Sequence, residues 1–171
     1  MRAAYGYDPT GPQVGDKIIN LHNEWELLSN HDNPLTNGVI GTIKEMETQN
    51  WDYPYWLRNE KLSVPIITAT ISGDEEAEEF SMISFDKNEL LTGNSSLTSK
   101  EEYIIIKRLE MPVPLHFNFG YAITVWKAQG SEWNKILLFQ EAGWPRIIDE
   151  RRKYMYTGIT RAVDKLVVVS N

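Results

Sequence analysis

The first two thirds of the chain carry short apolar stretches separated by turn signals, a pattern typical of β-strands. Asn37-Gly38 is the strongest hairpin-turn signal among them. Five short strands joined by turns predict a small β-barrel, which we expect to occupy residues 14–111. The expected strands are residues 18–21, 39–43, 64–71, 80–85 and 103–106.

One aromatic segment within this region, residues 49–60, fits neither a strand nor a helix clearly. It contains Trp51, Tyr53, Tyr55 and Trp56. These side chains could stack on nucleic-acid bases, or they could close the core of a small barrel. The second interpretation is the more common one for aromatic residues in a β-rich segment.

The pattern changes after Met111-Pro112-Val113-Pro114, where two prolines mark a boundary. We expect strands at residues 119–125, 135–139 and 165–170, and a helix over 149–161 with Asp149 as its N-cap. The last two strands are almost wholly apolar, as in strands buried on both faces of a parallel sheet. Residues 112–171 therefore predict the edge of an α/β sheet, preceded by the barrel and by a lead-in of residues 1–13.

Composition excludes several classes of site. The 171 residues include no cysteine, which rules out disulfides, thiolate zinc sites and a cysteine nucleophile. His22, His31 and His116 lie far apart and suggest no metal site. No apolar run approaches the length needed to cross a bilayer, so we expect no membrane contact.

The net charge of −7 argues against a protein that coats nucleic acid. The charge is uneven, because an acidic cluster occupies residues 74–79. Lys127 and the basic run at residues 151–153 lie close to the polar segments described next. A local basic groove is therefore compatible with an acidic chain.

Two polar segments near the C-terminal end, residues 121–133 and 156–162, carry the candidate chemistry. Thr124 ends an expected strand, where its hydroxyl could donate to a phosphate oxygen. Lys127 adds charge, and Gln129 can donate or accept a hydrogen bond. Gly130 lets a backbone N–H approach a ligand closely, and Glu132 could accept from a ribose hydroxyl. The plainer interpretation is a polar turn with nothing bound.

Arg161 follows the expected helix and precedes an apolar strand. A guanidinium at that place can bind a phosphate through a bidentate fork. The alternative is a helix-terminal cation paired with a neighbouring carboxylate.

Both segments resemble motifs of known proteins. Residues 122–133, Ala-Ile-Thr-Val-Trp-Lys-Ala-Gln-Gly-Ser-Glu-Trp, and residues 156–162, Tyr-Thr-Gly-Ile-Thr-Arg-Ala, resemble motifs V and VI of superfamily 1 DNA helicases. The resemblance is nearest to the RecD-like and phage Dda-like branch. Upstream, residues 15–19 and 37–41 resemble the opening of the SH3-like barrel that this branch inserts into its second RecA-like domain.

This resemblance implies a role for each residue. Arg161 would contact the γ-phosphate of ATP, which is bound with Mg²⁺ between two RecA-like domains. Gly130 and Glu132 would lie at the nucleotide side of that cleft. The residues implied to contact single-stranded DNA are Thr124, Trp126, Lys127 and Gln129. Trp126 departs from the pattern, because the family usually has histidine there.

The sequence contains no Gly-x-x-x-x-Gly-Lys-Ser/Thr phosphate loop. We therefore expect the C-terminal part of a longer helicase, inactive as an ATPase alone and completed in cis by an N-terminal RecA-like domain. We also expect a monomer in the cytoplasm of a bacterial or phage-infected cell. Two alternatives stay open: a non-enzymatic nucleic-acid or protein binding module with a degenerate helicase tail, and an unrelated phosphate-binding α/β enzyme.

Overall fold

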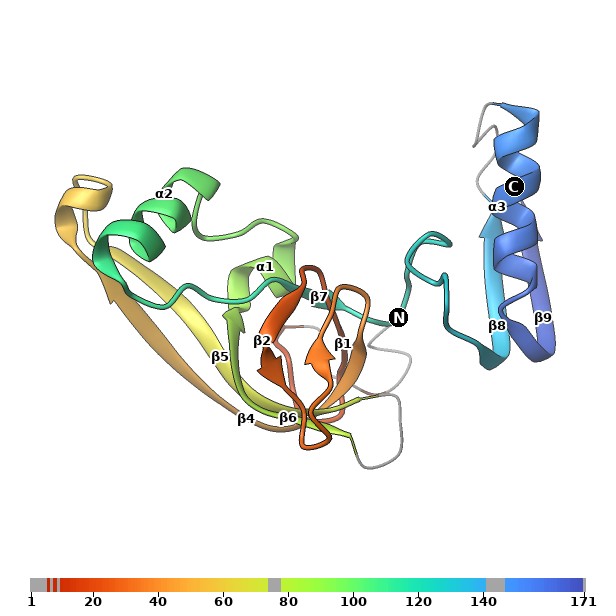
Figure 1. Ribbon diagram of the computed structural model, residues 1–171, viewed down its shortest axis with the longest axis horizontal. Coiled ribbons are helices and arrows are strands. Elements are labelled where there is room, and N and C mark those ends of the chain that lie inside the picture. The colour runs from red at the N-terminus through yellow and green to blue at the C-terminus, as the bar shows by residue number, and fades with distance from the viewer. Residues whose placement is uncertain (1–5, 7, 9, 74–77, 141–146, 171) are drawn as a thin grey trace. The chain divides into compact units, whose positions relative to one another are not determined.

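The computed structural model describes residues 6, 8, 10–73, 78–140 and 147–170. Most of the acidic cluster and the loop at 141–146 lie outside these residues. The chain divides into two compact units, Met1–Tyr121 and Ala122–Asn171 (Figure 1). Among the described residues, no helix is long and apolar enough to cross a membrane.

Unit 1 is built on a five-stranded antiparallel sheet with the strand order β6-β5-β4-β1-β7. The strand Lys17–Asn20 pairs on both sides: Ile18 lies opposite Gly41 on one neighbour and opposite Phe119 on the other. The strands are β1 (Lys17–Asn20), β4 (Ile40–Tyr53), β5 (Leu62–Ser72), β6 (Glu79–Asp86) and β7 (Phe117–Phe119). A separate hairpin consists of β2 (Glu24–Leu28) and β3 (Pro34–Leu35).

The expected closed barrel is not formed in the described part of the chain. The two edges of the sheet approach at one parallel bridge, Phe85 to Leu115, where the Leu115 N–H donates to the Ser84 carbonyl at 2.8 Å. The chain then leaves β6 and pairs with β1 from Phe117 onward. Because this contact is a single bridge and no ladder, the sheet stays open, and the fold is a strand-rich α/β plus β arrangement.

Two helices connect β6 to β7, and one of them replaces an expected strand. α1 (Lys87–Thr92) is capped by Asp86, and α2 (Ser99–Ile104) continues into a π-helical turn, Ile105–Leu109. The prediction of a strand at 103–106 is therefore wrong. Thr98 and Glu101 form a capping box, which nucleates a helix and outweighs the β-preference of the isoleucine run. The fifth strand of the sheet is β7.

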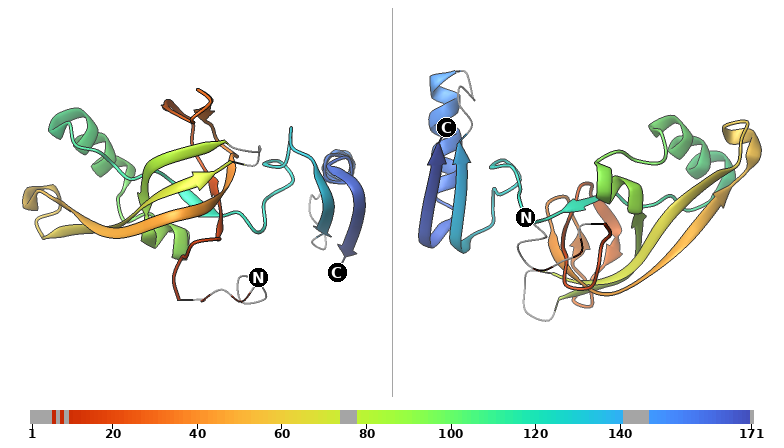
Figure 2. Two further views of the ribbon diagram at one scale, coloured as in Figure 1. Left: turned by 90° about the horizontal axis from the view of Figure 1, so that it is seen from below. Right: turned by 180° about the vertical axis from the view of Figure 1, so that it is seen from behind.

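β4 and β5 form a long hairpin that extends beyond the other strands, with α2 alongside it (Figure 2). It ends in a 3-10 helix, Tyr55–Leu57. We call residues 49–66 together with α2 and the π-helical turn the arm. Its aromatic residues divide: Tyr53 is buried and donates its hydroxyl to the Pro112 carbonyl at 3.0 Å, whereas Tyr55 and Trp56 are exposed.

Unit 1 buries two hydrophobic clusters. The first lies within the sheet and comprises Ile18, Leu35, Ile43, Ile67, Ala69, Ile71, Phe80, Ile83, Phe85, Leu90 and Phe117. The second fills the arm and comprises Tyr53, Leu62, Val64, Ile66, Leu97 and Ile105. The arm thus has its own core between the hairpin and the helical segment.

Unit 2 is a strand–helix–strand unit made of β8 (Trp133–Gln140), α3 (Ile148–Ile159) and β9 (Ala162–Ser170). The two strands are parallel, with Ile136 opposite Leu166 and Leu138 opposite Val168, so the expected order of elements is present. The start of the helix differs from the sequence prediction. Asp149 lies in the first turn of α3 and is not its N-cap, which is Ile147 and makes no side-chain cap.

The expected strand at 119–125 is also wrong, because β7 ends at Phe119 and the next residues form turns. Gly120 explains part of this. A Cβ there would lie 3.2 Å from the carbonyl carbon and oxygen of Ile18, so the backbone passes close to β1 before it turns away. The following residues then close on themselves through the bond from the Ala128 N–H to the Thr124 carbonyl, 3.1 Å.

The apolar strands of unit 2 are not buried on both faces, contrary to expectation. Leu138 is 5% exposed, whereas its neighbour Leu137 is 66% exposed. The exposed outer face of the two strands carries Leu137, Phe139, Val167 and Val169. Side chains alternate along a strand, so α3 covers Leu138 on one face and leaves the other face bare. Its cover is partial, because Val168, opposite Leu138 on β9, remains 44% exposed.

Candidate functional site

The segment at the start of unit 2 is a tight polar turn that exposes most of its polar side chains. The Thr124 hydroxyl oxygen accepts from the Lys127 N–H at 3.3 Å, which fixes the start of the turn. Val125 and Ala128 are buried and anchor it. The candidate residues Thr124, Trp126, Gln129, Gly130 and Glu132 are all exposed, and Lys127 is half-buried.

Gly130 has φ +90°, a backbone conformation that side chains rarely adopt. A Cβ at this position would meet no atom within 4 Å, so the space around its backbone is open. The glycine is therefore required by conformation and not by crowding. Open space beside an exposed backbone is the condition for a close approach by a ligand.

Arg161 follows the C-terminal end of α3 and joins the two candidate segments. Its Nε donates to the Thr157 carbonyl at 3.3 Å, and one terminal nitrogen donates to the Thr160 hydroxyl at 3.2 Å. The other terminal nitrogen donates to the Ser131 carbonyl at 3.3 Å. The backbone supports the same junction, since the Trp133 N–H donates to the Arg161 carbonyl at 2.9 Å.

These contacts engage one N–H on each guanidinium nitrogen within the described residues. A guanidinium carries a second N–H on each terminal nitrogen, so one further donor remains on each of these two nitrogens. The guanidinium is not paired with a carboxylate in the part of the chain described here. The alternative of a helix-terminal ion pair is therefore not what the geometry shows.

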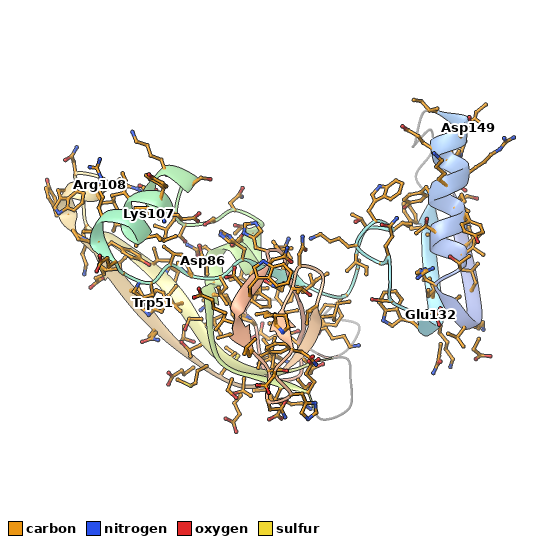
Figure 3. The ribbon with its side chains drawn as sticks, viewed as in Figure 1. Trp51, Asp86, Lys107, Arg108, Glu132 and Asp149 are labelled. Carbon is orange, nitrogen blue, oxygen red and sulfur yellow. The ribbon has the colours of Figure 1, made fainter. Side chains whose placement is uncertain are left out.

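The candidate site lies at one end of unit 2. Glu132 immediately precedes β8 and Arg161 immediately precedes β9, so both lie at the amino ends of the two parallel strands. Figure 3 shows Glu132 at this end and Asp149 at the opposite end of α3. Our expectation of a site at a strand's carboxyl end is wrong, because it depended on the strand at 119–125.

The basic run at 151–153 lies away from this junction and makes structural contacts. Arg152 forms an exposed ion pair with Asp149 at 3.5 Å within α3. The Gln140 amide, oriented with its oxygen toward Arg151, accepts two hydrogen bonds from that guanidinium at 2.6 and 2.9 Å. Arg151 thus ties the start of α3 to the end of β8.

Trp126 contacts α3 as well as solvent. Its ring meets Tyr154 edge-to-face with a centroid separation of 6.1 Å, and 45% of the residue remains exposed. Such aromatic pairs contribute about 0.5–1.5 kcal/mol beyond their buried area. Part of the indole surface therefore packs against Tyr154, and another part remains exposed to solvent.

Sequence reasoning assigned no role at the site to two residues that shape it. Gly158 is buried where α3 crosses β8, and a Cβ there would lie 3.0 Å from both terminal carbons of Leu138. A glycine inside a helical pattern is a signal for such close packing. Ser131 contributes its backbone carbonyl to Arg161, and no side-chain pattern could have announced that role.

No group of three or more His, Cys, Asp or Glu residues in the described ranges is placed to hold a metal ion. The site therefore offers hydrogen-bond donors and two cations, the chemistry that binds phosphate oxygens. It offers no carboxylate set of its own for a divalent cation.

Of the comparisons with known proteins, one matches part of the chain. No curated protein matches the chain. Residues 119–169 match the family model of the UvrD-like helicase C-terminal domain, and this match supports a superfamily 1 helicase C-terminal region in unit 2.

Proposed function

We propose that the chain supplies the C-terminal part of an ATP-dependent DNA helicase of the RecD-like or Dda-like branch. Arg161 reaches the γ-phosphate of ATP·Mg²⁺ held by an N-terminal RecA-like domain in cis. The turn at 124–130 holds the backbone of single-stranded DNA. The observation that carries the proposal is the bond from the Arg161 guanidinium to the Ser131 carbonyl, because it joins both candidate segments in one junction.

The state of Arg161 supports a phosphate contact. Three hydrogen bonds to oxygen atoms of the chain hold the guanidinium in one orientation while a donor pair stays available. A fixed cation needs little reorganisation when charge develops on a transferring phosphoryl group. Mg²⁺ would be bound by the phosphates and by the domain that carries the phosphate loop.

The exposed turn supports a backbone contact to DNA. Thr124, Gln129 and the N–H of Gly130 are small or neutral donors, and Lys127 makes no ion pair within the described residues. Donors of this kind hold phosphates without reading base sequence. Trp126 can add stacking from the part of its ring that Tyr154 leaves free.

The bare outer face of β8 and β9 supports a larger α/β sheet or a covering layer in the complete domain. Parallel sheets are normally covered on both faces, and four large apolar residues here are not. Unit 1 would be the insertion that precedes motif V, as an open variant of an SH3-like barrel. Its single bridge from Phe85 to Leu115 is consistent with that origin.

The test of Arg161 uses the polypeptide in which this chain is joined to its phosphate-loop domain. Arg161→Ala is expected to lower the rate of ATP hydrolysis by roughly 10³–10⁵-fold while single-strand affinity stays within about twofold. Arg161→Lys keeps the charge but loses the fork, so its activity should also fall strongly. Arg152→Ala, at an exposed arginine on the helix α3 that precedes Arg161, is the matched control and should keep full activity.

Loss of DNA affinity with unchanged hydrolysis would assign Arg161 to the DNA backbone and contradict the proposal. Hydrolysis of ATP by the present chain alone, abolished by Arg161→Ala, would contradict the need for a second domain. It would instead favour an independent phosphate-binding α/β enzyme.

A further inference from the structure

The arm carries exposed aromatic and cationic side chains that the proposed function does not use. Tyr55 and Trp56 in the 3-10 helix are 68% and 54% exposed, and Tyr103 on α2 is 63% exposed. Lys107 and Arg108, in the π-helical turn, are also exposed, and Figure 3 labels both on the arm. Clusters of large exposed aromatics mark surfaces that another molecule covers.

The end of the hairpin is fixed to the helical side of the arm. Nε of Arg58 donates to one Glu101 carboxylate oxygen at 2.6 Å, and a terminal nitrogen donates to the other at 2.7 Å. The same nitrogen donates to the Ser96 carbonyl at 3.1 Å. A bidentate pair of this kind adds geometric specificity, so the backbone that carries Tyr55 and Trp56 is held in place.

The exposed aromatics are not needed to fill the core of the arm. That core is already closed by Tyr53, Leu62 and Ile105, with Leu57 packed against them. Tyr55 and Trp56 therefore project from an arm whose hydrophobic core is complete without them. Their exposure has no packing explanation within the described residues.

Two of the cations on the arm, Lys107 and Arg108, are available for a ligand. Arg58 is paired with Glu101, and Lys61 lies 3.7 Å from Asp52. Lys107 and Arg108 make no ion pair among the described residues. Glu101 and Ile105 face the hairpin, so Tyr103 and Lys107, four positions apart, share the opposite side of the helical segment.

We propose that the arm is a second contact surface for single-stranded DNA, separate from the turn at 124–130. Bases stack on Tyr55, Trp56 and Tyr103, while Lys107 and Arg108 contact phosphates. The choice of single-stranded DNA as the ligand rests on the proposed function. The location of the contact surface rests on the exposed side chains of the arm. Aromatic faces next to unpaired cations are the chemistry of sequence-tolerant single-strand binding.

A protein partner fits this surface less well. Tyrosine, tryptophan and arginine are enriched at protein–protein interfaces but lysine is depleted there, so Lys107 is the residue that favours a nucleic acid. Because the whole chain has a net charge of −7, attraction for DNA must come from such a local group and not from overall charge.

The experiment measures binding of a fluorescent oligothymidine to the full 171-residue chain by anisotropy. Tyr55→Ala combined with Trp56→Ala should weaken binding roughly 5- to 150-fold for each stacked base lost. The matched control is Trp25→Ala, since Trp25 on β2 is 66% exposed and lies outside the arm. Melting curves of all variants should coincide, because the substituted side chains are exposed.

Two further readouts separate stacking from charge. Lys107→Ala with Arg108→Ala should lower the slope of log affinity against log salt by about 0.7 per cation. A duplex of the same length should bind more weakly than the single strand, since its bases are already stacked. Equal binding of the duplex would overturn the stacking role.

Crosslinking of an oligonucleotide that contains 5-iodouracil distinguishes the arm from the turn. Crosslinks at Tyr55, Trp56 or Tyr103 support the inference. Crosslinks confined to residues 124–130, with arm variants binding normally, would overturn the arm and leave the proposed function standing. If binding depends on the arm residues and Lys127→Ala leaves the affinity unchanged, the result supports the arm and contradicts the proposed role of the turn. Absence of single-strand binding would overturn the arm, while the hydrolysis test of Arg161 would still decide the proposed function.

Discussion

The Arg161 guanidinium donates to the Ser131 carbonyl at 3.3 Å, so one side chain connects the end of α3 to the turn that precedes β8. A backbone hydrogen bond makes the same connection, since the Trp133 N–H donates to the Arg161 carbonyl. A displacement at either segment is therefore transmitted to the other. In a helicase this would couple the strand contact to the nucleotide contact.

Loss of this side-chain bond should loosen the turn. In Arg161→Ala we expect faster amide hydrogen exchange at residues 128–132, with exchange in β8 and β9 nearly unchanged because the backbone bond remains. The control is Arg152→Ala, whose exposed pair with Asp149 should contribute little. Unchanged exchange at the turn in Arg161→Ala would show that the backbone alone holds the junction.

Gly158 sets how closely α3 approaches β8. Gly158→Val should destabilise unit 2 by about 1–3 kcal/mol, since the added carbons overlap Leu138. Gly158→Ala should change stability by less than about 1 kcal/mol, because the higher helix propensity of alanine offsets the tight contact. Denaturant titration of single variants and of Gly158→Val with Leu138→Ala measures the coupling. Additive effects would contradict direct contact.

The sequence predicted unit 2 well and unit 1 in part, for physical reasons. The apolar runs at 135–139 and 165–170 have no competing signal, and both are strands. At 103–106 the β-branched run competes with the capping box of Thr98 and Glu101, and the helix forms. The main sheet has five strands, but its last strand is β7, which lies outside residues 14–111, and the hairpin of β2 and β3 was not predicted.

The sequence predicted which residues belong to the candidate site, but not the hydrogen bonds that connect them. Thr124, Gln129 and Glu132 are exposed, as their polar character suggested. The link from Arg161 to Ser131 uses a backbone carbonyl, which every residue has, so no sequence pattern could reveal it. The bare face of β8 and β9 was missed because an apolar strand predicts burial, while its neighbours decide whether burial occurs.

His116 makes the stability of unit 1 depend on pH. Its Nδ1 lies 2.8 Å from a Glu89 oxygen and its Nε2 3.5 Å from a Glu102 oxygen. The hydrogen bond with Glu89 raises the pKa of His116 above 6.5, against the opposing effect of burial, and the charges of Glu89, Glu102 and Glu24 add to the rise. The ring of His22 also faces it, 4.4 Å away.

A raised pKa means that the folded state binds the proton more tightly than the unfolded state. The stabilisation is fully present below about pH 6.5 and is lost as pH rises through the folded-state pKa. Thermal melts across this range should show a falling melting temperature that His116→Gln removes. His31→Gln, an exposed histidine, is the control and should keep the slope.

The Arg58–Glu101 pair predicts the opposite dependence at low pH. The hydrogen bond from Arg58 lowers the pKa of Glu101 to about 2, with bonds from Thr98 contributing and burial opposing. Stability from this carboxylate is present above its ordinary pKa of about 4.5 and is lost as pH falls toward 2. Arg58→Ala should therefore move acid unfolding of the arm to higher pH and cost about 1–3 kcal/mol at neutral pH. Lys61→Ala, which removes a fully surface-exposed pair, should do neither; if it acts equally, general charge and not the fork is responsible.

Leu137 and Leu138 are adjacent and differ in exposure, so they test whether the outer face of β8 is bare in this chain. Leu138→Ala should cost roughly 2–5 kcal/mol, because Leu138 packs under α3 and is 5% exposed. Leu137→Ala should stay within about 0.5 kcal/mol, since 66% of Leu137 is already in water. The measurement is denaturant unfolding followed by exchange protection in β8. If the chain is joined to a domain that covers this face, Leu137→Ala should become nearly as costly as Leu138→Ala. Equal costs in the present chain would mean that self-association already covers the face, which sedimentation would reveal and Leu137→Glu would abolish.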